Sequence, residues 1–321
     1  MNKWIGKRLG SRTFGITISA ALLASVLAVS ADAAPAAATQ TAPAAKQTAA
    51  VTAAAASEQI YNRFLTLVQQ PGQQASALAY LRAHIGKVTR YQASLMVLRL
   101  ENAMHDGLPA LGSRFSDSAV QQAIGEVYKP GDTLAVVRDR MTDISVQTLV
   151  NEASVRGYKL ETSEGLFYPV VNYSIFHEFR EHVSEDIDSY ILIMAEESRE
   201  AAVKDAAIVI GYQQLVRRTL TMERFLDDYP RSNRTAKVKG LFERYKAMTF
   251  YGTSNTELFG HDGEEMRPNA RIGYANILKW VSADNSRYLS ELRDFMALAE
   301  KYEYHNSAEL RDFVKDIFAE A

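Results

Sequence analysis

Cysteine is absent from the 321 residues of this chain, and charge of one sign is not in excess. The lack of cysteine excludes a disulfide framework, a thiol nucleophile and a thiolate zinc site. Lysine and arginine total 36 and aspartate and glutamate total 38, so the formal net charge of −2 lacks the basic excess of a nucleic-acid-binding protein. The hydrophobic share of 47% is that of a globular protein, long enough for one large domain or two smaller ones.

Residues 1–33 have the three parts of a secretory signal peptide. A basic start is followed by the uncharged stretch 16–29 and then by the small residues Ala31 and Ala33. A membrane anchor is the weaker interpretation, because the uncharged stretch falls short of the ~20 residues that a spanning helix needs. A lipoprotein would need a cysteine at the cleavage site. We therefore expect export, with no stable membrane insertion after cleavage.

Removal of residues 1–33 takes away four basic residues and one acidic residue, which changes the net charge from −2 to −5. Export without cysteine favours a cell envelope that does not rely on disulfides, as in Gram-positive bacteria. The negative charge argues against passive adhesion to anionic wall polymers or lipid headgroups. The predicted location is secreted, extracellular or associated with the cell wall.

Residues 34–56 contain thirteen alanines, two prolines and a single large apolar residue, Val51. Such a segment buries too little surface to offset the entropy lost when it becomes ordered. We expect a disordered linker over 34–56, in which residues 53–56 extend the following helix by at most a turn.

From Ser57 onward, apolar residues recur at helical spacing in short runs that end at proline or glycine. The pattern predicts an all-α fold of packed helical hairpins, with an N-terminal helical region over 57–156 and a C-terminal one over 157–321. Residues 134–154 are expected to form one or two helices. The expected helix breaks are Pro71-Gly72, Gly107 with Pro109, and Pro130-Gly131.

The stretch 157–173 departs from the helical period. Aromatic and β-branched residues flank Glu164-Gly165, which predicts a small β-hairpin or an ordered loop. Pro169 restricts any strand here to the edge of a sheet. This is the only sheet that the sequence predicts.

Helices are expected to resume at Tyr173 or Ser174 and to include residues 202–217, and Thr221 is the expected cap of a helix that stops at Pro230. The segment Phe225–Ser232 resembles the turn of tetratricopeptide-like helical repeats. There a proline stops one helix, a serine caps the next, and a tyrosine packs between them. A weaker copy begins 52 residues later at Ile277, a longer spacing than the ~34 residues of a standard repeat.

The C-terminal half also resembles uncharacterised secreted proteins and lipoproteins of Gram-positive bacteria. The resemblance implies no activity, cofactor or catalytic residue. Asn172 stands where an acidic residue is expected, which argues against a metal at that position. The segments that carry the resemblance are Gly157-Tyr158, Glu164-Gly165, Tyr168-Pro169, Asn172-Tyr173, 193–198, 204–207 and 225–232.

Few motifs for catalysis or cofactor binding are present. His177 and His182 are five residues apart, about 140° around an α-helix, whereas zinc proteases place two histidines four apart on one face. The glycine patterns of nucleotide-binding loops and of the hydrolase nucleophile elbow are also missing. The sequence therefore predicts no metal and no cofactor.

Acidic and aromatic residues around the expected hairpin are the remaining candidates for a ligand-binding site. Glu164 and Glu196, as paired carboxylates facing one cleft, would suit glycoside or peptide hydrolysis. The structural alternative, which we favour, is that Glu164 caps a helix or pairs with Lys204. The candidate ligand-binding residues are Glu164, Tyr168, Tyr173, Glu196, Glu197, Lys204 and Asp205.

These patterns lead to two functional hypotheses. The first is a non-catalytic interaction or scaffold protein of the cell envelope, whose helical hairpins form a groove for a peptide or protein partner. The alternative is a hydrolase that acts on cell-wall material through paired carboxylates. The sequence favours the first, because no catalytic motif accompanies the carboxylates.

Overall fold

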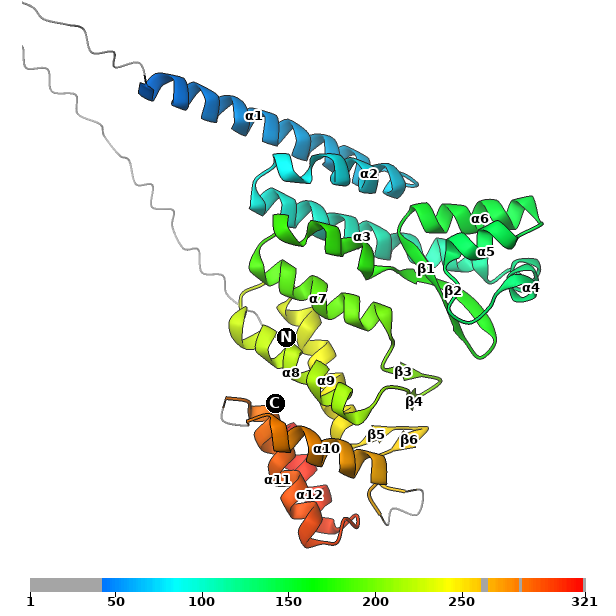
Figure 1. The fold of residues 1–321 in the computed structure, drawn as a ribbon, viewed down its shortest axis with the longest axis vertical. Coiled ribbons are helices and arrows are strands. Elements are labelled where there is room, and N and C mark those ends of the chain that lie inside the picture. The colour runs from blue at the N-terminus through cyan, green and yellow to red at the C-terminus, as the bar shows by residue number, and fades with distance from the viewer. Residues whose placement is uncertain (1–41, 261–264, 283–284, 320–321) are drawn as a thin grey trace, which may run out of the picture. The chain divides into compact units, whose positions relative to one another are not determined.

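Helices make up most of the structure (Figure 1), and several of them begin at a side chain that caps the first turn. This computed structural model describes residues 42–260, 265–282 and 285–319, and the predicted signal peptide lies outside them. Apart from the helices, the described residues form three small two-stranded sheets, so the predicted all-α fold with a minor β component is confirmed. Within the described ranges, no helix has both the length and the hydropathy to cross a membrane.

The chain divides into two units, 1–48 and 49–321, and the division falls within helix α1 (Ala42–Val68). Of the first unit, the structure describes the helical residues 42–48. The segment predicted to be a disordered linker, 34–56, is thus helical from Ala42 onward, and Pro43 lies in the first turn, where proline is tolerated. The predicted division between 156 and 157 falls inside the second unit.

The second unit opens with α2 (Gln74–His84), a short 3₁₀ helix η1 (Ile85–Lys87) and α3 (Arg90–Phe115). Thr89 and Gln92 start α3 with a reciprocal capping box. The break predicted at Gly107 and Pro109 is wrong, because α3 continues through both residues. Apolar side chains before and after them are buried in the core and hold the helix together; they include Leu100, Met104, Leu111 and Phe115.

Three shorter helices follow: α4 (Ser118–Val127), α5 (Leu134–Arg140) and α6 (Ile144–Val155). Each starts at a side chain that accepts a hydrogen bond from the first turn, namely Asp117, Thr133 and Asp143. The stretch 134–154 is therefore two helices, one of the two outcomes that the sequence predicted.

The predicted hairpin is present as β1 (Tyr158–Ser163) and β2 (Leu166–Val171), antiparallel and joined by Glu164-Gly165. Both turn residues have positive φ, 51° and 77°, which suits a tight hairpin turn. The prediction that no other sheet exists is wrong. Two hairpins with two-residue strands also occur, β3 (Val203–Lys204) with β4 (Ala207–Ile208) and β5 (Gly252–Thr253) with β6 (Thr256–Glu257). Strands this short carry no alternating pattern that a sequence can reveal.

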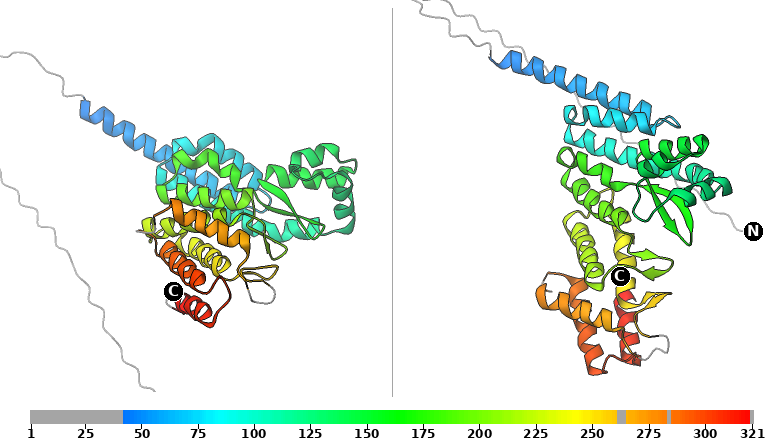
Figure 2. Two further views of the ribbon diagram at one scale, coloured as in Figure 1. Left: turned by 60° about the horizontal axis from the view of Figure 1, so that its bottom comes forward. Right: turned by 45° about the vertical axis from the view of Figure 1, so that its right-hand side comes forward.

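A 3₁₀ helix η2 (Tyr173–His182) and six α-helices complete the unit. From η2 to α9 each helix packs against the next one along the chain, whereas α10 packs on α8, and α11 and α12 follow, each against the helix before it (Figure 2). The helix predicted over 202–217 starts only at Tyr212, because 203–208 form a hairpin. The helices are α7 (Glu185–Arg199), α8 (Tyr212–Asp228), α9 (Thr235–Phe250), α10 (Pro268–Trp280), α11 (Arg287–Lys301) and α12 (Ala308–Ala319).

The turn between α8 and α9 confirms the predicted stop before the proline but not the predicted serine cap, because the N-cap residue of α9 is Arg234 and has no capping side chain. α8 ends at Asp228, just before Pro230, and Ser232 accepts a hydrogen bond from the backbone N–H of Arg234 at 3.2 Å. Thr221 is not a cap, because it lies inside α8. At the weaker copy, Ser286 does cap α11, accepting from the N–H of Leu289 at 2.9 Å.

Candidate functional site

The seven predicted ligand-binding residues do not form one site but lie in three separate regions of the structure. Glu164 is exposed at the β1–β2 turn, and Tyr168 is exposed on β2. Lys204 forms its ion pair with Glu161, at 3.2 Å, so the predicted pair with Glu164 is wrong. Asp205, beside it, accepts a hydrogen bond from the Ser163 hydroxyl. These contacts join β1 to the β3–β4 hairpin.

Tyr173 belongs to a different place, a buried charge cluster centred on Glu101 of α3. The Glu101 side chain is 2% exposed and accepts hydrogen bonds from the hydroxyls of Tyr173 and Tyr190. Two cations complete the cluster: Arg234 lies 2.7 Å from one carboxylate oxygen and Lys237 lies 3.0 Å from the other. α3, η2, α7 and α9 thus meet at one carboxylate.

The cluster keeps Glu101 ionised. Burial alone raises the pKa of a carboxyl group, but Lys237, Arg234 and the two tyrosine hydroxyls outweigh it and lower the pKa of Glu101 to about 2. Burial and the adjacent carboxylate raise the pKa of Tyr173, so its hydroxyl stays protonated and donates to Glu101. A carboxylate this firmly ionised and enclosed is a structural anchor and a poor proton donor at neutral pH.

Glu196 and Glu197, at the end of α7, face a third place, around Arg218 of α8. Arg218 is buried, and its guanidinium lies 3.2 Å from a carboxylate oxygen of each. Tyr245 of α9 donates a further hydrogen bond to Glu197. A cavity of about 520 Å³ opens here between α7 and α8, with the apolar side chains Leu192, Ile193 and Met222 also in its lining.

The pKa values of the two neighbouring carboxyl groups are shifted in opposite directions. Burial raises the pKa of Glu197 in spite of Tyr245 and Arg218. The pKa of Glu196 is lowered, because hydrogen bonding and charge from Arg199 and Arg218 outweigh a smaller burial than that of Glu197. Such a separation of two pKa values is expected of a general acid and a general base, although Glu196 and Glu197 both already bind the guanidinium of Arg218.

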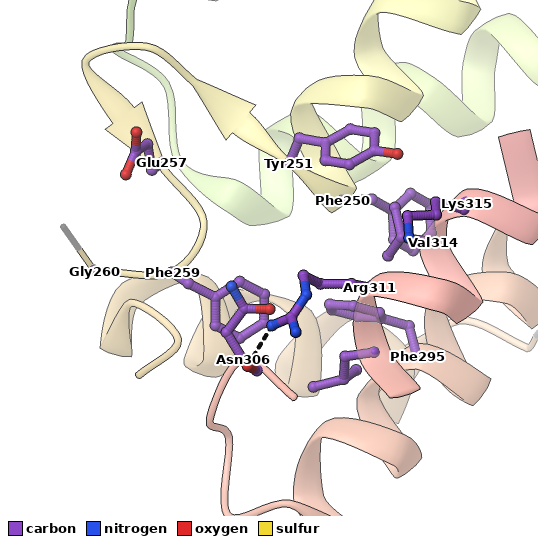
Figure 3. Close-up of a pocket in the computed structure, with 11 residues that line it drawn as sticks. Phe250, Tyr251, Glu257, Phe259, Gly260, Phe295, Asn306, Arg311, Val314 and Lys315 are labelled. Carbon is purple, nitrogen blue, oxygen red and sulfur yellow. Dashed lines mark hydrogen bonds between the residues drawn. The ribbon is translucent and has the colours of Figure 1, made fainter. Parts of the chain in front are cut away.

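An aromatic cavity near the C-terminus is the most apolar of these places (Figure 3). It has a volume of about 420 Å³ and lies between α9, the segment after β6, and α12. Phe250, Phe259 and Phe295 form much of its wall, together with Leu310 and Val314. Its size and lining are those of a ligand-binding cavity in an ordinary protein.

Polar groups are few around the aromatic cavity. Arg311 extends across it and donates a hydrogen bond to the Asn306 carbonyl at 2.9 Å, as Figure 3 shows. Lys315 and Glu257 lie at its margin. Tyr251, which also lines the cavity, is 52% exposed. An apolar cavity with a few convergent polar groups can hold an apolar side chain and orient it.

Metal ligands do not gather in the described part of the chain: no group of three or more acidic or histidine residues there is suitably placed. His177 and His182 both lie in η2, a 3₁₀ helix. Glu178 between them pairs instead with Arg82, at 2.8 Å. Comparison of the chain with protein families, with characterised proteins and with solved structures finds no match.

The sequence predicted three residues of the Glu101 cluster and the Arg218 cavity, namely Tyr173, Glu196 and Glu197. It missed Glu101, Arg234 and the aromatic cavity. Glu101 sits in a helix that carries other charged residues, and its partner Arg234 is 133 residues away. One signal was available for the cavity, since Phe250 and Tyr251 lie together just before a glycine.

Proposed function

We propose that this chain is an exported, non-catalytic protein of the cell envelope that binds a protein partner at the aromatic cavity. The observation that carries the proposal is the cavity itself, with three phenylalanines in its wall and Tyr251 exposed beside it. Aromatic side chains dominate the energetics of protein interfaces, and tyrosine and arginine are enriched among their most important contacts. Arg311 supplies the second of these residue types.

The carboxylates support a binding role over catalysis. Glu101 is enclosed by its four partners, and Glu196 and Glu197 both bind Arg218. A catalytic carboxylate has to reach the substrate, and in this arrangement each one already has a strong partner. Glu164, the predicted second catalytic group, is at a hairpin turn and is not among the residues that line the cavity of Glu196.

Site-specific photo-crosslinking in cells that make the protein tests the proposal. A photoreactive phenylalanine analogue in place of Tyr251 should yield one discrete adduct, and Arg311→Glu in the same chain should abolish it. The matched control carries the analogue at Tyr91, which is 72% exposed on α3, and should give no such adduct. An adduct that survives Arg311→Glu, or that forms equally from position 91, would refute binding at this cavity.

Hydrolysis of a wall polymer is the second candidate, favoured by the opposite pKa directions of Glu196 and Glu197 in one cavity. In that case Glu197 acts as the acid and Glu196 as the base. Purified protein would release soluble fragments from cell walls, and Glu197→Gln would abolish release without unfolding the protein. Activity that persists in Glu197→Gln would contradict this assignment.

A further inference from the structure

A third concave surface lies where the start of α8 meets the start of α10, next to the cavity of Glu196 and Glu197, with which it shares Gln214 and Arg217. It is an open groove of about 860 Å³, and it shares no residue with the lining of the aromatic cavity. Its most exposed apolar side chains are Val209, just before α8, and Ile272 of α10, which are 50% and 58% exposed, and Ile208, Ile210 and Pro268 also line it. Gly273 lets the two helices approach, because a Cβ there would lie 2.7 Å from that of Tyr212.

The first turn of α8 faces this groove with its backbone N–H groups uncapped. The N-cap residue is Gly211, which has no side chain to accept from them. The first turn of a helix has free N–H groups and the positive end of the helix dipole, and both attract an anion. A Cβ on Gly211 would meet no described atom within 4 Å, so the space in front of the turn is open.

Two arginines add positive charge to the groove. Arg217 lies one and a half turns into α8, and Arg267 precedes α10, with its Nε donating to the Glu257 carbonyl at 2.5 Å. Among the described residues that line the groove, none is acidic. The nearby carboxylate of Glu200 is engaged by Gln214 at 2.6 Å and by Arg218 at 3.2 Å.

A buried hydroxyl without a partner is the independent sign of a missing ligand group. Tyr212 lines the groove, is 9% exposed, and its hydroxyl has no hydrogen-bond partner among the described residues. Leaving a buried donor unpaired is unfavourable, so such groups are uncommon in native structures. Burial raises the pKa of this hydroxyl, and the charge of Arg267 acts in the opposite direction.

We propose that this groove binds the C-terminal carboxylate of a peptide whose last residue is apolar. The carboxylate lies at the first turn of α8, where it accepts from the free N–H groups and pairs with Arg217 and Arg267. The terminal side chain packs on Val209 and Ile272. Capture of a peptide carboxylate by clustered backbone N–H groups is a known mode of peptide recognition. The site stands independently of the aromatic cavity.

Fluorescence anisotropy with short labelled peptides tests this proposal on the full chain. A peptide that ends in Val-Leu with a free carboxylate should bind about tenfold or more tightly than its C-terminal amide, because hydrogen bonds to a charged group are the strong ones. The same peptide ending in Gly-Gly should bind several-fold more weakly, since it lacks apolar contact. Equal binding of acid and amide, or no binding of any peptide, would overturn the proposal.

Two substitutions at one position provide matched variants. Gly211→Asp places a carboxylate where the ligand would lie and supplies a helix cap, so it should abolish peptide binding while thermal stability stays equal or rises. Gly211→Ala leaves the N–H groups free, and its φ of −68° suits alanine, so binding should stay within about twofold. Retained binding in Gly211→Asp would refute the site. Full displacement of the peptide by inorganic phosphate at equal concentration, with both peptide ends binding alike, would replace it by a simple anion site.

Discussion

Glu101→Gln is the sharpest test of how this fold is held together. The substitution preserves the shape of the side chain and removes its charge. Arg234 and Lys237 then lose the carboxylate that lies 2.7 Å and 3.0 Å away, and Arg234 stays largely enclosed. Removing one partner of a buried ion pair costs about 3–5 kcal/mol, because the other charge is left uncompensated.

The pKa of Glu101 gives a second route to the magnitude. Its ordinary value is 4.5, and the cluster lowers it to about 2. A pKa difference of one between the folded and unfolded states corresponds to about 1.4 kcal/mol, so the ionised form contributes roughly 3 kcal/mol to the free energy of unfolding. The two routes agree on a loss of about 3 kcal/mol at pH 7 in the Gln variant.

The pH dependence has a definite sign. Because the folded-state pKa lies below the unfolded one, the contribution of Glu101 is complete well above pH 4.5 and is lost as the pH falls toward 2. Urea unfolding of the wild type and of Glu101→Gln, at several pH values between 7 and 3, measures it. The difference in unfolding free energy should shrink as the pH falls. A difference below about 1 kcal/mol at pH 7, or one that does not change with pH, would refute the reasoning.

Glu243→Gln on α9 is the matched control. Its ion pair with Lys239 is 3.6 Å long, and both side chains are more than half exposed. Exposed pairs of this kind contribute about 0–1 kcal/mol. Equal destabilisation by the two substitutions would show that enclosure of the Glu101 cluster does not matter.

The structure leads to expected outcomes for three further substitutions, the first of them with a matched control. Gly157→Ala should lower the unfolding free energy by about 2–5 kcal/mol, because φ is +89° there and a Cβ would lie 2.6 Å from the Ile175 side chain. The control Gly131→Ala, where φ is +90° and no described atom lies within 4 Å, should lower it by about 1–2 kcal/mol. Chemical denaturation measures both differences. Ser286→Ala should lower the unfolding free energy by about 1 kcal/mol through loss of the α11 cap, as thermal melts would show. Glu197→Gln should cause no loss of stability at pH 7. The pKa of Glu197 is raised in the folded state, so its ionised form, which prevails as the pH rises, contributes less to the stability of the folded state than the protonated form does. A large decrease in the unfolding free energy at pH 7, measured in urea, would contradict this.

Local signals in the sequence predicted much of the fold, and the exceptions have physical causes. Glu164-Gly165 between β-prone runs predicted the first hairpin, because the residues of a tight turn determine its geometry. Pro109 predicted a break that does not occur. One missing backbone hydrogen bond is outweighed by the apolar side chains that α3 buries on both sides of it.

The candidate sites were harder to predict because their parts come from distant segments. The free N–H groups of the first turn of α8, after Gly211, belong to the backbone, so no residue type marks them. The hydroxyl of Tyr212 is significant only because the folded structure leaves it without a described partner. Glu196 and Glu197 could be singled out from the sequence, but Arg218, which binds both, is reached only when α8 packs on α7.

The Glu101 cluster also constrains how the chain completes its fold during synthesis. A ribosome releases α3 long before α9, so the carboxylate exists for more than a hundred residues of growth without either cation. Until Arg234 and Lys237 arrive, closing α3 onto η2 and α7 would bury an uncompensated charge. Packing of α3 against η2 and α7 is therefore favoured only when the chain up to Lys237 is present to join it.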